Sequence, residues 1–115
     1  MVELRVFTLD KVIGGDTYEI AYAHSYPKQH WSKDSLYFAD EEDGIGVLSP
    51  YFDDIFKVYA YYGDQKITLL EWQEIEKRCR ADYEDNASVD KFFATITEWI
   101  EKGNRGAEYF WILGI

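Results

Sequence analysis

Carboxylates are the side chains of this sequence that could most readily take part in chemistry, and they gather in its middle third. Residues 34–64 contain eight acids and one base, Lys57, and so carry seven of the ten excess negative charges. The acids are Asp34, Asp40, Glu41, Glu42, Asp43, Asp53, Asp54 and Asp64. Residues 1–33 balance at four acids and four bases, and residues 65–115 have ten acids against seven bases. Such a local imbalance produces negative potential that steers basic partners.

Metal binding is the first function that an acidic cluster suggests, but the spacing does not fit it. An EF-hand loop needs glycine at position six and glutamate at position twelve. With Gly44 at position six, Pro50 falls at position twelve. A transition-metal site would need clustered soft ligands, whereas His24, His30 and Cys79 belong to three different predicted elements. We expect no metal and no other cofactor.

Nucleophilic catalysis has no better support. Cys79 lies on the apolar side of a predicted helix, where a thiol behaves as a small inert hydrophobe. The sequence has no G-x-S-x-G elbow and no glycine-rich phosphate loop. A hydrolase that uses paired carboxylates remains an alternative, because distances in space are not visible in a sequence. The expectation is a protein that is not an enzyme.

The acids themselves are the best candidates for a binding site. The quartet at residues 40–43 is predicted to lie at a hairpin tip that leads directly into a helix carrying Asp53 and Asp54, so the two groups should converge. Aromatic residues nearby, with Trp31 in an adjoining loop, would add flat apolar area. The predicted partner-binding residues are Asp40, Glu41, Glu42, Asp43, Tyr51, Asp53, Asp54 and Tyr61. The competing interpretation is a surface whose charges only interact with water.

The first half of the chain predicts two hairpins. Residues 2–9 and 17–24 alternate apolar with polar side chains around the turn signal Gly14-Gly15-Asp16, which predicts an antiparallel pair. The apolar runs 35–39 and 45–48 flank the acidic quartet, and we interpret them as a second hairpin.

The second half predicts helices. Ser49 and Pro50 suit the start of a helix that would end at Gly63, although a strand over residues 58–62 competes with it. Thr68 to Glu71 is a capping box, and Ile67 and Trp72 occupy the positions of a hydrophobic staple.

The last elements predicted are a helix and a strand. Ser88 should cap a helix that ends at Gly103, with Trp99 on its apolar face. Residues 108–115 are apolar on both faces, which predicts a strand in the interior of a sheet. The whole chain, 1–115, is therefore expected to be one α+β domain. It should have a mostly antiparallel sheet of about five strands, two to three helices on one face, and the C-terminal strand inserted in the sheet.

Composition limits the partners and the compartment. Hydrophobic residues make up 47% of the 115 residues and aromatics 18%, so the chain should fold despite its net charge of −10. A single cysteine fits a reducing compartment, and the sequence shows no signal peptide and no apolar run long enough to span a membrane. The sequence pI near 4.5 implies repulsion by nucleic acid and anionic lipid. We expect a cytoplasmic protein that binds neither nucleic acid nor membrane.

One stretch resembles a known group of proteins. Residues 61–72, YYGDQKITLLEW, are similar to the glycine, short polar loop and capped helix start of many small acidic bacterial proteins. Among these are immunity proteins of polymorphic and contact-dependent toxin systems. The resemblance implies a protein that neutralises a toxin, often a basic nuclease, by covering its active site, and it carries over no functional residue. With the acidic patch, it predicts a cytosolic binding protein that occludes a basic protein partner, and the alternative is a phage- or stress-related mimic of nucleic-acid charge.

Overall fold

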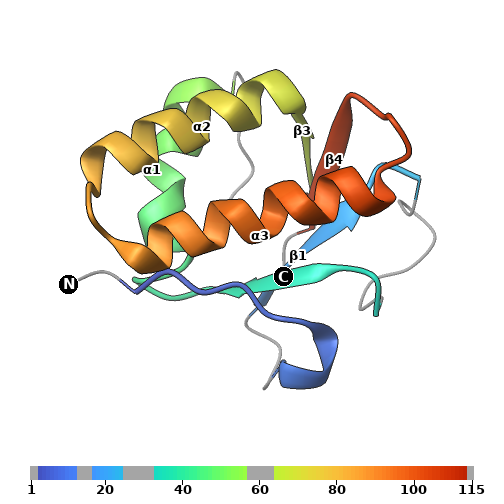
Figure 1. Cartoon of the computed structure of the whole chain (residues 1–115), viewed down its shortest axis with the longest axis horizontal. Coiled ribbons are helices and arrows are strands. Elements are labelled where there is room, and N and C mark those ends of the chain that lie inside the picture. Colours follow the sequence, from blue (N-terminus) through green and yellow to red (C-terminus); the bar gives the residue numbers. More distant parts are fainter. Residues whose placement is uncertain (1–2, 13–16, 25–32, 57–63, 114–115) are drawn as a thin grey trace.

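Strands come first in the chain and helices dominate its second half, as the sequence predicted for an α+β fold. The computed structural model describes residues 3–12, 17–24, 33–56 and 64–113 (Figure 1). Within these ranges there are four strands, three α-helices and a short 3-10 turn, η1 (Leu9–Lys11). The elements are β1 (Thr17–Tyr22), β2 (Leu36–Ala39), α1 (Ile45–Ile55), β3 (Gln65–Thr68), α2 (Leu69–Asp82), α3 (Ala87–Gly103) and β4 (Tyr109–Leu113).

The C-terminal strand lies inside the sheet. The described strands have the order β2-β1-β4-β3, and every neighbouring pair is antiparallel. Phe110 and Ile112 of β4 are buried on the face that packs on the helices, and Leu113 is buried on the opposite face. The apolar character of both faces correctly predicted the interior position. The sheet has four described strands, however, instead of about five.

The first predicted hairpin is wrong. The described part of the segment 2–9 does not form a strand beside β1, and its one backbone pairing with the sheet is a bridge between Phe7 and Tyr37 of β2. Each of these two residues donates its backbone N–H to the other's carbonyl, at 2.9 and 2.8 Å. Leu4 enters the core, and its N–H donates to Ser88 Oγ at 3.0 Å. Alternation shows that a segment can bury one face, but it does not specify the neighbouring strand.

The second predicted hairpin is wrong as well, because residues 45–48 begin α1 instead of a strand. Ile45, Leu48 and Phe52 recur at helical spacing and are all buried. This helical pattern extends over more residues than the short apolar run 45–48 from which a strand was predicted, and so it is the better guide to the structure. Ser49 and Pro50 therefore lie inside the helix, not at its start. The predicted end at Gly63 is also wrong, because Phe56 has an extended backbone and the helix ends at Ile55. Residues 57–63 lie outside the described residues.

The capping box at the start of α2 is confirmed. The Thr68 hydroxyl oxygen accepts the Glu71 N–H at 3.1 Å, and the Glu71 carboxylate accepts the Thr68 N–H at 2.9 Å. The two residues predicted to form the staple, Ile67 and Trp72, are both buried in the core.

Thr68→Ala should lower the free energy of unfolding by about 1 kcal/mol, because it removes the side-chain acceptor at the start of α2. The measurement is the midpoint of urea unfolding, followed by helical circular dichroism. Thr97→Ala is the matched control, since Thr97 is exposed inside α3, where alanine is a good helix former. Equal midpoints for the two variants would show that the capping box does not stabilise α2.

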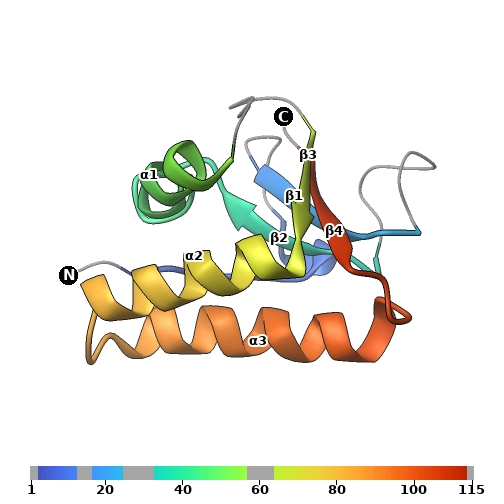
Figure 2. The same cartoon turned by 90° about the horizontal axis from the view of Figure 1, so that it is seen from above.

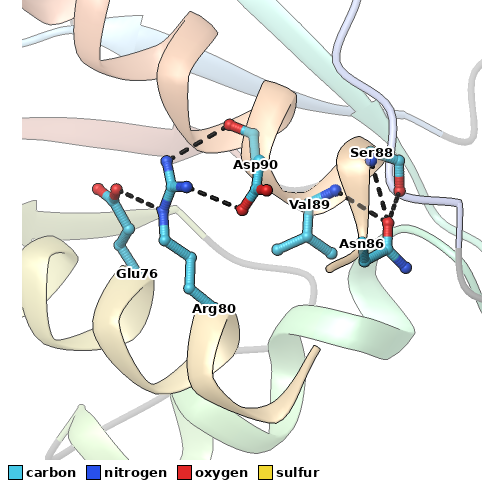
Figure 3. A network of polar contacts seen from close by, with 6 residues as sticks. All are labelled: Glu76, Arg80, Asn86, Ser88, Val89 and Asp90. Carbon is cyan, nitrogen blue, oxygen red and sulfur yellow. Dashed lines mark hydrogen bonds and ion pairs between the residues drawn. The ribbon is translucent and has the colours of Figure 1, made fainter. Parts of the chain in front are cut away.

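The cap of α3 is Asn86 and not Ser88. The Asn86 side-chain oxygen accepts the N–H groups of Ser88 and Val89 at 3.0 and 3.2 Å, and also the Ser88 hydroxyl at 2.7 Å (Figure 3). The Ser88 oxygen is itself the acceptor for Leu4. Both Asn86 and Ser88 are residue types that can cap a helix. Here the Ser88 hydroxyl oxygen accepts the Leu4 N–H of the N-terminal segment, and Asn86 caps the helix.

The helices α2 and α3 run antiparallel, side by side (Figure 2). The apolar core joins buried side chains of the three helices to those of the sheet. Trp72 of α2 contacts Phe93 of α3 and Phe110 of β4, with ring centroids 5.4 and 5.5 Å apart. Trp99 of α3 stacks on Tyr22 of β1, with centroids 4.0 Å apart. The start of α3 lies beside the N-terminal segment, to which it is joined by the hydrogen bond from Leu4 to Ser88.

Candidate functional site

The predicted acidic patch is divided into two groups. Residues 40–43, here called the acidic turn, connect β2 to α1, whereas Asp53 and Asp54 lie in the last turn of α1. An α-helix rises about 1.5 Å per residue, so α1 holds the two groups roughly 15 Å apart along its axis. They do not converge as predicted, because α1 begins at Ile45 and most of its length separates them.

The group at the end of α1 takes part in contacts between helices. Asp54 forms an ion pair with Arg78 of α2, which also binds Glu74 at 2.8 Å. The Tyr51 hydroxyl donates to Asp82 at 2.7 Å, and burial together with this bond raises the pKa of Tyr51. Asp53 is exposed. Tyr51 and Asp54 thus join α1 to α2, while the predicted site residue Tyr61 lies outside the described residues.

The acidic turn is held by its own backbone. The Glu41 carbonyl accepts the N–H groups of Gly44 and Gly46, both at 3.0 Å. Gly44 packs so closely that a Cβ there would lie 2.2 Å from the carbonyl oxygen of Ala39, so no other residue fits without a backbone shift. The chain reverses tightly at this point and presents four consecutive carboxylates.

The carboxylates of the acidic turn form one weak ion pair with the described residues. Glu41 and Glu42 are exposed, and Asp40 and Asp43 are half-buried. Glu41 Oε1 lies 3.9 Å from Arg5 Nη2, and the two side chains are 50% and 67% exposed. An exposed pair at this distance contributes about 0–1 kcal/mol. It is the one ion pair that the acidic turn forms with the described residues.

The acidic turn forms one wall of a cleft with a volume of about 880 Å³, within the size range of ligand sites. The N-terminal segment (residues 3–7) and the first half of α3 form the other walls. Leu4 and Phe92 are its most deeply buried apolar residues. Glu3, Asp40, Glu41 and Asp43 line the cleft together with the bases Arg5, Lys11 and Lys91.

No pattern in the sequence predicted this cleft, because its walls come from segments far apart in the chain. The sequence-based prediction also missed a buried carboxylate. Glu19 was expected on the polar face of β1, yet it is 4% exposed and accepts hydrogen bonds from Ser35 and Tyr37, at 2.6 and 3.4 Å. These hydroxyls satisfy a carboxylate that would otherwise be costly to bury. Burial and the nearby Glu19 charge raise the pKa of Tyr37.

The described part of the chain contains neither a reactive cysteine nor a cluster of metal-binding side chains. Cys79 is fully buried, and burial raises its pKa to about 11, so the thiol stays protonated and unreactive at neutral pH. The described residues contain no group of three or more His, Cys, Asp or Glu side chains that could hold a metal ion. None of the helices described here is both long enough and apolar enough to cross a membrane.

The geometry therefore offers a charged, concave surface lined by both carboxylates and bases. Comparisons of the chain with protein-family models, with curated proteins and with solved structures find no match. The acidic turn and its cleft are the features from which a function must be argued.

Proposed function

We propose that this chain is an acidic binding protein that occludes a basic protein partner. The observation that supports the proposal most directly is the acidic turn, with four consecutive carboxylates, two of them exposed. Among the described residues these carboxylates form a single long ion pair, to Arg5. Its position on the wall of a cleft adds a concave surface that a partner could enter.

Several charges on the helices are compensated by ion pairs. Each of the helical bases Arg78, Arg80 and Lys102 lies within 3.1 Å of a carboxylate on a helix. Arg80, for example, binds Glu76 on its own helix and Asp90 of α3 (Figure 3). Because these pairs offset one another, the acidic turn is left as a concentrated source of negative potential. Such a potential accelerates association with a basic protein and suppresses binding of acidic ones.

The specific form of the proposal is immunity to a bacterial toxin, with a basic nuclease domain as the partner. The resemblance of residues 61–72 to small acidic immunity proteins supports this form, as does the net charge of −10. In this function the chain performs no reaction and acts in the cytoplasm. Electrostatic attraction brings the nuclease in, and apolar contacts around the cleft set the lifetime of the complex.

The direct test uses a panel of purified basic nuclease toxin domains from several fold classes. The purified chain is immobilised, binding is followed by interferometry, and nuclease activity is assayed with and without the chain. Capture of one domain with loss of its activity would support the proposal, and failure to capture any would contradict it. A captured DNA-binding protein without toxicity would instead favour a mimic of nucleic-acid charge.

Reversing two charges of the acidic turn should slow capture of the nuclease. We expect Glu41→Lys with Glu42→Lys to lower the association rate constant by about tenfold or more at low ionic strength. The wild-type rate constant should itself fall as salt rises. The free energy of unfolding should hardly change, because these side chains are exposed.

The matched control is Glu98→Lys with Glu101→Lys on α3. Each double variant changes net charge by the same amount, and each removes one exposed ion pair, Arg5–Glu41 or Lys102–Glu98. Equal association rates for the two variants would mean that net charge alone matters and that the acidic turn is not the interface.

A further inference from the structure

We propose that the N-terminal segment, residues 3–7, is a latch that opens as one unit while the sheet and the helices stay folded. The closed latch pairs with the outer side of β2, which is at the edge of the described sheet, and it forms a wall of the cleft. Opening therefore exposes the edge of β2 and removes that wall. The inference concerns the free chain and does not depend on the proposed function.

The closed latch is fixed at its two ends. At one end the Leu4 N–H donates to Ser88 Oγ of α3 at 3.0 Å, and the Leu4 side chain is buried in the core. At the other end Phe7 exchanges two backbone hydrogen bonds with Tyr37 of β2, at 2.9 and 2.8 Å. The two ends are three residues apart in the chain, so release of one end loosens the other.

The latch has little buried surface of its own. Leu4 is the one residue of the segment that is buried, and Glu3 and Arg5 are exposed. Val6 and Phe7 are half-buried. The cleft of about 880 Å³ is lined by every residue of the latch and by the first half of α3, so the two are not packed together along their whole length. Few buried apolar contacts are typical of segments that open locally, at a lower free energy than global unfolding.

The sheet does not depend on the latch for its main pairing. The strands β1 and β2 pair over four residues, whereas the latch pairs with β2 at one bridge in the described structure. When the latch opens, β2 keeps its hydrogen bonds to β1 and loses those to Phe7. Opening should therefore expose much less surface than global unfolding does.

Two neighbouring amides of β2 report separately on the latch and on the sheet. Tyr37 donates its N–H outward to the carbonyl of Phe7. Because successive N–H groups of an antiparallel strand point to opposite sides, the N–H of Phe38 faces Tyr18 of β1. Opening of the latch frees the Tyr37 N–H and leaves that of Phe38 bonded.

The test is amide hydrogen exchange of the full chain, labelled with ¹⁵N, in water and in urea below the unfolding transition. We expect Leu4, Phe7 and Tyr37 to be protected at least about 100-fold less than Phe38 and Ile112. Protection of the three latch amides should depend weakly on urea and that of Ile112 steeply, because the urea dependence scales with the surface exposed. Equal protection and equal urea dependence in the two groups would overturn the inference.

Ser88→Ala tests whether the latch opens as one unit. The substitution removes the acceptor of the Leu4 N–H, while Asn86 still accepts the two backbone N–H groups that it caps at the start of α3 (Figure 3). Protection of Leu4, Phe7 and Tyr37 should fall together by about tenfold, the effect of losing one hydrogen bond. A fall at Leu4 alone would overturn the inference, because the two ends would then open separately.

Thr68→Ala is the matched control, since it weakens the whole fold at the start of α2, outside the contacts of the latch. Protection of Ile112 should fall by about fivefold, because global unfolding becomes easier. Protection of Leu4, Phe7 and Tyr37 should stay the same, because the open latch keeps α2 folded. An equal fall in both groups would mean that the latch opens only when the whole chain unfolds, and would overturn the inference.

Discussion

A chain that ends at Gly106 should not unfold cooperatively, because it lacks β4. This strand lies between β1 and β3, so its removal leaves both neighbours without a partner on that side. It also removes the buried side chains Phe110, Ile112 and Leu113. Burial of a large apolar side chain contributes about 1.5–3 kcal/mol, and a whole domain is stable by only about 5–15 kcal/mol.

Urea unfolding followed by tryptophan fluorescence and by circular dichroism measures this effect. We expect a gradual change without a transition for the truncated chain. A chain that ends at Leu113 is the control, because it keeps all of β4. A sigmoidal transition for the chain that ends at Gly106, at the same midpoint by both methods, would mean that the rest of the fold is stable without its central strand.

Trp99→Ala should lower the free energy of unfolding by about 3–5 kcal/mol, the range for removing a large aromatic side chain from a core. Trp99 stacks on Tyr22 and meets Phe110 edge to face, with centroids 6.0 Å apart. Its indole N–H also donates to the carbonyl of Asp34 at 2.8 Å. The substitution therefore removes a contact to β1, a contact to β4 and a hydrogen bond. A melting curve like that of the wild type would contradict this role.

A comparison with Trp72 separates the hydrogen bond from the packing. Trp72 is equally part of the core, but its indole N–H has no acceptor among the described residues. Trp99→Phe breaks a hydrogen bond and Trp72→Phe does not. Trp99→Phe should therefore be the more destabilising of the two by about 1 kcal/mol in urea unfolding. Equal losses would show that the bond to Asp34 makes no net contribution.

Local signals in the sequence were sufficient where all the interacting atoms lie within a few residues. The capping box that joins Thr68 to Glu71 is such a case, because both of its hydrogen bonds are complete within one turn of helix. The interior position of β4 was also predictable, since a strand that is apolar on both faces is stable only with both faces covered. These features establish the α+β class and the position of the last strand.

Where the sequence allowed two local structures of similar stability, tertiary contacts decided which of them forms. Asn86 and Ser88 can both cap α3, and the Ser88 oxygen is used by the N–H of Leu4, more than eighty residues away in the sequence. Residues 45–48 could form a strand or a helix, and the burial of Phe52 together with Ile45 and Leu48 favours the helix.

The same distinction applies to the candidate site. The sequence alone determined that negative charge gathers between residues 34 and 64, because charge is a property of composition. Only the tertiary structure decided that α1 separates this charge into two groups and that the acidic turn borders a cleft. The walls of that cleft come from the N-terminal segment, the acidic turn and α3, and no local pattern specifies that these three segments meet, because their contacts depend on the packing of the whole core.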